Sequence, residues 1–448
     1  MKKYFNNVFW RWHFYAGLFI TPLLITLSIT GIMYLFYPEV ENKVNHDLFF
    51  EQTSKPEQSL DDGLNDILKK HPGYHIMKVS FLKEDYNTRV TLMGPDDASK
   101  IVFLDHHNQI KGDIEPLQLF SNITRELHSN LLTGNSWVKY MVELSSCWAI
   151  FMIITGIFMT LYRKYLRKGE SKITRKNAAK LHAILGMILS VPLALLIFTG
   201  LPWSEFMGQK LYQFAVHNSV VGYPHAKGTP PVSNNEIPWA SRQEHTDSKH
   251  KEATQLPVKE IVSIAKEATQ LPVKEIVSIA KEDGFKKPYS IIVPMDKKGT
   301  YVVTKGSSTG VTGLDDSPFK ERTIHLDQYS GNKLAVFDYH DYGILAKVYA
   351  VGIPLHEGHL FGWPNKILNL IFTGMILVVM WYGIKIYLMR KKKGALSAPK
   401  AQPYKQFLWF FAVSLGLLGI LMPLFGFSLI AIGIIELILL LTKKKYAI

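Results

Sequence analysis

Four histidines occupy matching positions in two halves of the chain. His13 is followed by a glycine at +4 and by Thr-Gly at +17 and +18, and His182 is followed by the same residues at the same offsets. Later in each half a Leu-His pair precedes a glycine, which lies six residues after His128 and six after His356. Histidines at the edges of apolar segments are rare enough to be functional candidates. Their repetition predicts one kind of site built twice.

Two neutral imidazoles on facing helices are the axial ligands that a b-type haem needs in the core of a helix bundle. We therefore predict two haems, an inner one on His13 and His182 and an outer one on His128 and His356. The single cysteine, Cys147, excludes an intramolecular disulfide, a cysteine-based metal site and covalent c-type attachment. No metal other than haem iron and no catalytic side chain is predicted.

Neighbouring residues are secondary candidates. Gly17 and Gly186 lie one turn from their histidines, where a missing side chain leaves room for a flat macrocycle or allows close helix packing. If the segment is helical, His359 lies on the same face as His356, and it could replace His356 as the outer ligand or face the substrate.

Two carboxylates and two arginines complete the candidate set. Glu143 and Glu357 lie near the outer pair, where each could orient an imidazole or accept a proton, or be a solvated carboxylate at the membrane edge. Arg11 and Arg125 could pair with haem propionates, or be ordinary interfacial arginines.

Six apolar runs must position these residues, and the last two are shorter than the rest. We interpret that pair as two short spans, with a re-entrant hairpin as the alternative. In chain order the predicted segments are a first span 1–37, an external domain 38–139, a second span 140–162, a basic loop 163–182, a third span 183–203, an external domain 204–366, a fourth span 367–389, a loop 390–406, the fifth and sixth spans 407–441 and a tail 442–448.

The net charge of +14 is concentrated in four short segments beside these runs. They hold 20 of the 51 Lys and Arg residues but only one of the 37 acidic residues, Glu170, so the rest of the chain is slightly acidic. The positive-inside rule then places both termini and the basic loops in the cytoplasm. We therefore expect a lipid environment and no nucleic-acid partner.

Both external segments show the pattern of a small α+β domain. The first predicts a helix over 60–70 and strands near 77–82, 89–93 and 100–104; the second predicts a helix over 273–281 and strands near 290–293, 300–304 and 323–326. The predicted fold class is a membrane protein. Its helical bundle has about six spans, arranged as two parallel repeats of span–external domain–span plus a C-terminal pair, with two external α+β domains.

A perfect tandem duplication interrupts the second external segment. Residues 251–265 and 266–280 have the same sequence, and each copy contains a proline, Pro257 or Pro272. Proline prevents one straight helix through both copies. We expect one copy to form the helix of the domain and the other to be an excursion in the linker.

The motifs around the histidines resemble the PepSY-associated transmembrane helix family over about residues 1–390. The most specific stretch is Leu355–Gly362, and residues 324–331 look like the end of a PepSY domain. The other matching motifs are Arg11-Trp12-His13, Thr30-Gly31, Glu126-Leu127-His128, Leu181-His182 and Thr199-Gly200. Residues 391–448 are an added helix pair to which the resemblance assigns no role.

The resemblance implies a bacterial inner-membrane dihaem protein that reduces ferric siderophores outside the cytoplasm and is therefore a ferric reductase. The chain lacks Gly-x-Gly-x-x-Gly and Walker A motifs, and its cytoplasmic loops are short. A quinol or an electron-donor protein would therefore supply the electrons, and a ferric siderophore or another ferric chelate would accept them.

Two other functions stay open. The PepSY name came from proposed peptidase inhibition, so the chain could be a membrane-anchored protein that binds or inhibits an external peptidase. It could also be a component of iron or siderophore uptake. The absorption spectrum of the purified protein separates the haem protein from both alternatives.

Overall fold

The computed structural model describes residues 2–166, 175–218, 221–222, 270–296, 298–307, 310–390 and 408–445. The chain divides into two compact units. The first comprises Met1–Leu35, Glu126–Tyr212 and Trp363–Ile448, and the second comprises Phe36–Arg125 and Gln213–Gly362. The apolar helices therefore belong to one unit, and both external segments contribute to the other.

Within the described residues, four helices of the first unit are long and apolar enough to cross a membrane. They are α1 (Lys2–Leu35), α6 (Ser136–Leu166), α7 (Arg175–Gly200) and α12 (Trp363–Leu388). Contacts join α1 to α6 and α12, and α7 to the same two helices, so α1 and α7 lie across the bundle from each other. Four predicted spans are thus present as apolar helices. The predicted basic loop 163–182 is shorter than expected, because α6 extends to Leu166 and α7 begins at Arg175.

The C-terminal pair packs against the bundle. Helix α13 (Leu408–Leu421) contacts α14 (Pro423–Lys445), and α14 contacts α6. The Phe425 side chain is fully buried with its ring centre 4.7 Å from that of Trp148, and the Trp148 Nε1–H donates to Ser428 Oγ over 3.2 Å. These two helices are shorter in their apolar parts than the other four, and a crossing by them stays a prediction.

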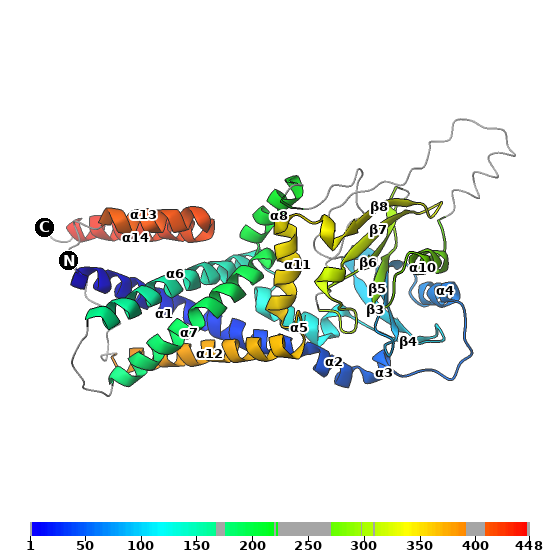
Figure 1. The fold of residues 1–448 in the computed structure, drawn as a ribbon, viewed down its shortest axis with the longest axis horizontal. Helices are drawn as coiled ribbons and strands as arrows, with labels where there is room; N and C mark the ends of the chain where they lie inside the picture. The colour runs from blue at the N-terminus through cyan, green and yellow to red at the C-terminus, as the bar shows by residue number, and fades with distance from the viewer. Residues whose placement is uncertain are drawn as a thin grey trace. The chain divides into compact units, whose positions relative to one another are not determined.

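The second unit contains one antiparallel eight-stranded sheet (Figure 1). Its order is β4-β3-β2-β1-β5-β6-β7-β8. The strands are β1 (His75–Phe81), β2 (Thr88–Met93), β3 (Ser99–Leu104), β4 (Ile110–Ile114), β5 (Tyr289–Ile292), β6 (Thr300–Lys305), β7 (Arg322–Asp327) and β8 (Lys333–Asp338).

The sheet joins the two external segments, which we had expected to fold as two separate domains. The first segment supplies β1–β4 and the second β5–β8, and β1 pairs with β5 at the centre. The register places Ser80 opposite Ser290, and their hydroxyl oxygens lie 2.9 Å apart in the interior. Each segment alone would leave one of these strands as an open edge, and pairing satisfies both edges.

Two helices cover one face of this sheet. Helix α4 (Leu60–Lys70) and helix α10 (Val273–Glu282) contact each other, and Ile67 and Ile276 are fully buried in the shared core. The α4 helix begins at an N-cap, where Ser59 Oγ accepts the Asp62 N–H over 3.1 Å. The α10 helix begins just after Pro272, so the second copy of the 15-mer forms the predicted helix. The first copy lies outside the described residues.

The other helices of the described residues lie between the spans and the strands in chain order. They are α2 (Tyr37–Val44), α3 (His46–Phe49), α5 (Phe120–Asn130), α8 (Met207–His217) and α11 (Ile344–Glu357), with short 3₁₀ turns at Pro95–Asp97, Pro116–Gln118, Leu201–Trp203, Pro318–Lys320 and Tyr339–Asp341. Helices α5 and α11 carry His128 and His356, and neither helix was predicted from the sequence. Helix α11 ends at Glu357 with Gly358 as its C-cap, so His359 lies beyond the helix and does not share a helical face with His356.

Candidate functional site

The first predicted pair, His13 and His182, comes from helices that lie across the bundle from each other. His13 is in α1 and His182 is in α7, and both side chains are half-buried. Their ring centres are 6.3 Å apart and the ring planes are at 88°. The fold therefore brings together two histidines that are 169 positions apart in the sequence.

This separation suits two ligands on opposite sides of one metal ion. A metal–imidazole bond is about 2 Å long and a ring nitrogen lies about 1 Å from its ring centre, so such a pair would have ring centres about 6 Å apart. Perpendicular ring planes are compatible with this arrangement, because each ring can rotate about its metal–nitrogen bond. The residues present therefore fit a bis-histidine haem at this level of the bundle.

A neighbouring helix fixes the orientation of each of these rings. His13 Nδ1 lies 2.9 Å from Thr155 Oγ1 of α6, and His182 Nδ1 lies 3.0 Å from the Val379 carbonyl oxygen of α12. A hydrogen bond at Nδ1 leaves Nε2 as the nitrogen that can bind a metal.

A glycine lies against each of these rings. A Cβ atom at Gly156 would lie 3.5 Å from His13 Cε1, and a Cβ atom at Gly383 would lie 3.5 Å from His182 Cε1. Each ring thus packs against a glycine that lies within about one helical turn of the residue that binds its Nδ1.

The two glycines singled out from the sequence behave differently. A Cβ atom at Gly186 would meet no other atom within 4 Å, so α7 leaves open space one turn from His182. A Cβ atom at Gly17 would lie 3.3 Å from the Met152 methyl carbon, so Gly17 serves close packing of α1 against α6. Of these two glycines, Gly186 is therefore the one with open space beside it.

His128 has the same local surroundings at the other end of α1. Its Nδ1 lies 2.9 Å from Thr30 Oγ1, and a Cβ atom at Gly31 would lie 3.5 Å from its Cε1. The 17 residues from His13 to Thr30 rise about 25 Å along the helix. The two histidine levels of the first unit are therefore near opposite ends of the bundle.

The alternative outer ligand, His359, has both ring nitrogens engaged. Its Nδ1 lies 3.0 Å from an Asp315 carboxylate oxygen and its Nε2 lies 3.0 Å from a Glu357 carboxylate oxygen. Burial alone would lower the pKa of His359, but the hydrogen bonds to both carboxylates raise it to about 10. His359 is therefore an imidazolium between two carboxylates, with no lone pair for a metal. His356 is also in the second unit, at the end of α11, and is half-buried.

The buried polar residues around this imidazolium form a network. The Glu41 carboxylate accepts the Ser121 N–H over 2.7 Å and the Thr312 hydroxyl. Burial, together with the carboxylates of Glu357 and Asp315, raises the pKa of the Tyr37 hydroxyl well above its ordinary value. Arg125 belongs to the same surroundings, and its Nη2 donates to Asn122 Oδ1 over 2.7 Å.

Glu143 and Arg11 have local roles in the structure. Glu143 is buried rather than solvated, and its carboxylate oxygens accept the backbone N–H groups of Phe206 and Met207 over 2.8 and 3.0 Å. It therefore holds the N-terminus of α8 and orients no histidine through these bonds. The guanidinium of Arg11 lies 5.6 Å from the ring centre of Tyr15.

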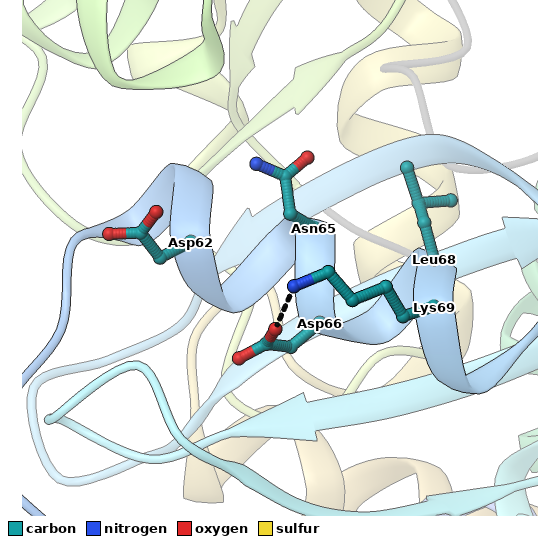
Figure 2. A pocket seen from close by; sticks show the side chains of 5 residues that line it. All are labelled: Asp62, Asn65, Asp66, Leu68 and Lys69. Carbon is teal, nitrogen blue, oxygen red and sulfur yellow. Dashed lines mark hydrogen bonds and ion pairs between the residues drawn. The ribbon is translucent and has the colours of Figure 1, made fainter.

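Two surface features outside the bundle do not form a comparable site. A shallow hollow over α4 is lined by Asp62, Asn65, Asp66, Leu68 and Lys69, and Figure 2 shows that Asp66 and Lys69 pair with each other across it. His46, Asp47 and Glu51 gather on α3 and just after it, but all three are exposed.

The partners of the histidines were missed by sequence reasoning, although one signal was present. Thr30-Gly31 and Thr155-Gly156 are the same dipeptide, and in both the threonine hydroxyl lies within hydrogen-bond distance of a histidine Nδ1 while the glycine lies against the ring. The partner of His182 is the backbone carbonyl of Val379, and every residue has such a group, so no residue type in the sequence could have indicated it.

Comparison with known families supports the resemblance seen in the motifs. A family model described as the PepSY-associated TM region matches residues 10–390. No curated protein matches the chain significantly. Because the family match covers most of the chain, including all four candidate histidines, the protein belongs to the PepSY-associated transmembrane family.

Proposed function

We propose that this chain is a transmembrane haem b oxidoreductase of the bacterial plasma membrane, with both termini in the cytoplasm. It passes electrons from a quinol or a donor protein to a ferric chelate outside. The family resemblance points to ferric siderophores as the substrate class.

The observation that carries the proposal is the inner histidine pair. His13 and His182 lie across the bundle with ring centres 6.3 Å apart, and each is held through Nδ1 by another helix. Haem bound between them would supply one-electron redox chemistry inside the apolar core. The protein's part would be to hold the two rings 6.3 Å apart, each engaged at Nδ1 so that Nε2 is the ligand atom, with open space beside Gly186.

The outer haem rests on the sequence repeat. His128 has the same Thr-Gly surroundings as His13, about 25 Å along α1, and the repeat makes His356 its counterpart in the second half. The engagement of both His359 nitrogens favours His356 as the ligand. Two redox sites near opposite ends of the bundle would carry electrons through a hydrocarbon layer of about 30 Å.

The chemistry at the outer end is a one-electron reduction. Fe(III) in a siderophore is bound by hard oxygen donors, and Fe(II) is held less tightly by them, so reduction favours release. Oxidation of one quinol to a quinone releases two electrons and two protons. The two electrons reduce two ferric complexes, one electron each.

The test is the purified full-length protein from cells supplied with haem. We expect a pyridine haemochrome spectrum of b type, two haems per chain, and reduction of a ferric hydroxamate chelate detected with an Fe(II)-trapping dye. His356→Ala should keep a reducible inner haem but lose chelate reduction, while His106→Ala, at an exposed turn, should match the wild type.

If the wild type carries no haem when haem is supplied, the oxidoreductase proposal fails. A PepSY protein that binds or inhibits an external peptidase then becomes the better hypothesis. If haem is bound but no ferric chelate is reduced, a role within iron or siderophore uptake would replace the reductase activity.

A further inference from the structure

The partners of the histidine rings determine which ring nitrogen carries the hydrogen. Thr155 Oγ1 lies 2.9 Å from the Phe151 carbonyl oxygen, one turn back on α6, and is fully buried. A carbonyl only accepts, so the single hydroxyl hydrogen of Thr155 is donated to it. Towards His13, Thr155 Oγ1 is then an acceptor, and His13 Nδ1 must carry the hydrogen.

The same reasoning applies to His128. Thr30 is buried, and its hydroxyl donates to the Thr26 carbonyl oxygen over 2.8 Å. Thr30 Oγ1 can therefore only accept from His128 Nδ1, which lies 2.9 Å away. Each threonine hydroxyl donates its hydrogen to a backbone carbonyl of its own helix. Its oxygen can therefore act only as an acceptor towards the neighbouring imidazole.

His182 reaches the same state through a different group. Its Nδ1 lies 3.0 Å from the Val379 carbonyl oxygen, which has no hydrogen to give. Gly383, four residues later on α12, lies against the same ring. Three histidines are thus held as Nδ1–H tautomers, two by a side chain and one by the backbone.

We propose that Thr155 and Thr30 are positioning residues of the two redox sites. Each holds its histidine with Nε2 as the metal-binding nitrogen and, by accepting from Nδ1–H, makes that nitrogen a stronger donor to iron. This inference rests on the proposed haem function. Because the Val379 carbonyl cannot be removed by substitution, Thr155 is the side chain through which the inner site can be tuned.

The test compares Thr155→Val with Thr155→Ser in the full-length protein. Valine keeps the shape of threonine but removes the acceptor, whereas serine keeps the hydroxyl. A weaker histidine donor stabilises ferric haem less, so we expect about a tenfold loss in ferric over ferrous preference in Thr155→Val. For a one-electron couple this raises the midpoint potential by about 59 mV.

Redox titration and low-spin EPR spectra provide the readouts. Thr155→Val should shift the inner component alone, Thr30→Val should shift the outer component alone, and Thr155→Ser should match the wild type. Loss of haem from Thr155→Val with retention in Thr155→Ser would also support the proposal. Thr160→Val, the same change on the same helix, is the control.

Unchanged potentials and spectra in Thr155→Val and Thr30→Val would overturn the inference while leaving the haem function intact. Equal disturbance by valine and serine at position 155 would also overturn it, because packing and not the hydroxyl would then be responsible. A wild type without haem would refute the proposed function itself.

Discussion

The imidazolium between Asp315 and Glu357 makes the stability of the second unit depend on pH. In the folded chain the pKa of His359 is raised from 6.5 to about 10 by hydrogen bonds to the two carboxylates, against the opposing effect of burial. His359 is therefore charged at neutral pH when folded and largely neutral when unfolded. Its protonation contributes to the free energy of unfolding.

The sign follows from proton linkage. Because the folded-state pKa lies above the unfolded value, the contribution is complete below about pH 6.5 and is lost as the pH rises to about 10. A difference of that size corresponds to about 5 kcal/mol at most, at about 1.4 kcal/mol per pKa unit. Removing one partner from a fully buried ion pair typically costs about 3–5 kcal/mol. The side chains of His359 and Asp315 keep 20% and 26% of their surface exposed, so the cost here lies below that upper bound.

The perturbation is His359→Gln, which keeps a polar group of similar size but cannot carry the charge. At pH 6 we expect its Tm to lie about 10 °C below that of the wild type. The wild-type Tm should fall between pH 6.5 and pH 10 while that of the variant stays flatter, so the two curves converge. Thermal unfolding of the detergent-solubilised full chain measures both, and His340→Gln, at an exposed position, is the control.

Parallel curves for wild type and His359→Gln across this pH range would refute the reasoning. That result would mean that the unfolded chain and the folded chain bind the proton of His359 equally well. An equal decrease in Tm for His340→Gln would show that the effect comes from a general change in surface charge and not from the pairing of His359.

Three further outcomes are expected. Cysteines at Ser99 and Ser248 should react with an impermeant maleimide in intact cells once Cys147 is masked, and labelling only after lysis would reverse the proposed topology. Deletion of residues 251–265 should leave expression and haem content near normal, since the second copy of the 15-mer forms α10; loss of folded protein would show that both copies are needed. Burial raises the pKa of Glu321 from 4.5 to about 8, so its contribution to stability is lost as the pH rises through that range. Glu321→Gln should therefore raise the Tm at pH 8 and flatten its pH dependence, and an unchanged pH profile would contradict this.

Local sequence patterns predicted the elements that depend on local physics. The apolar runs gave four spans, the amphipathic run after Ser59 gave α4, and alternation gave the central strands. The edge strands β4 and β8 were missed. Their side chains are mostly only partly buried and include Lys111 and Lys333, so they lack the alternating apolar pattern of the inner strands.

Local sequence patterns could not predict the pairing of strands that are far apart in the sequence. The β1–β5 contact joins segments more than 200 residues apart, and nothing in either strand indicates that its partner lies in the other half. Similarly, the repeat singled out the histidines, but the groups that hold their rings lie on other helices. The alternatives for Glu143 were a group that orients an imidazole or accepts a proton and a solvated carboxylate, because its actual partners, the backbone N–H groups of Phe206 and Met207, lie 63 and 64 residues away.

That His13 and His182 share one haem is tested most directly by low-spin EPR and reduced-minus-oxidised spectra of His13→Ala and His182→Ala. Either substitution removes one of two axial ligands, so both variants should lose the same spectral component and keep the other. Loss of different components, or retention of both components in either variant, would contradict the pairing that their 6.3 Å ring separation supports.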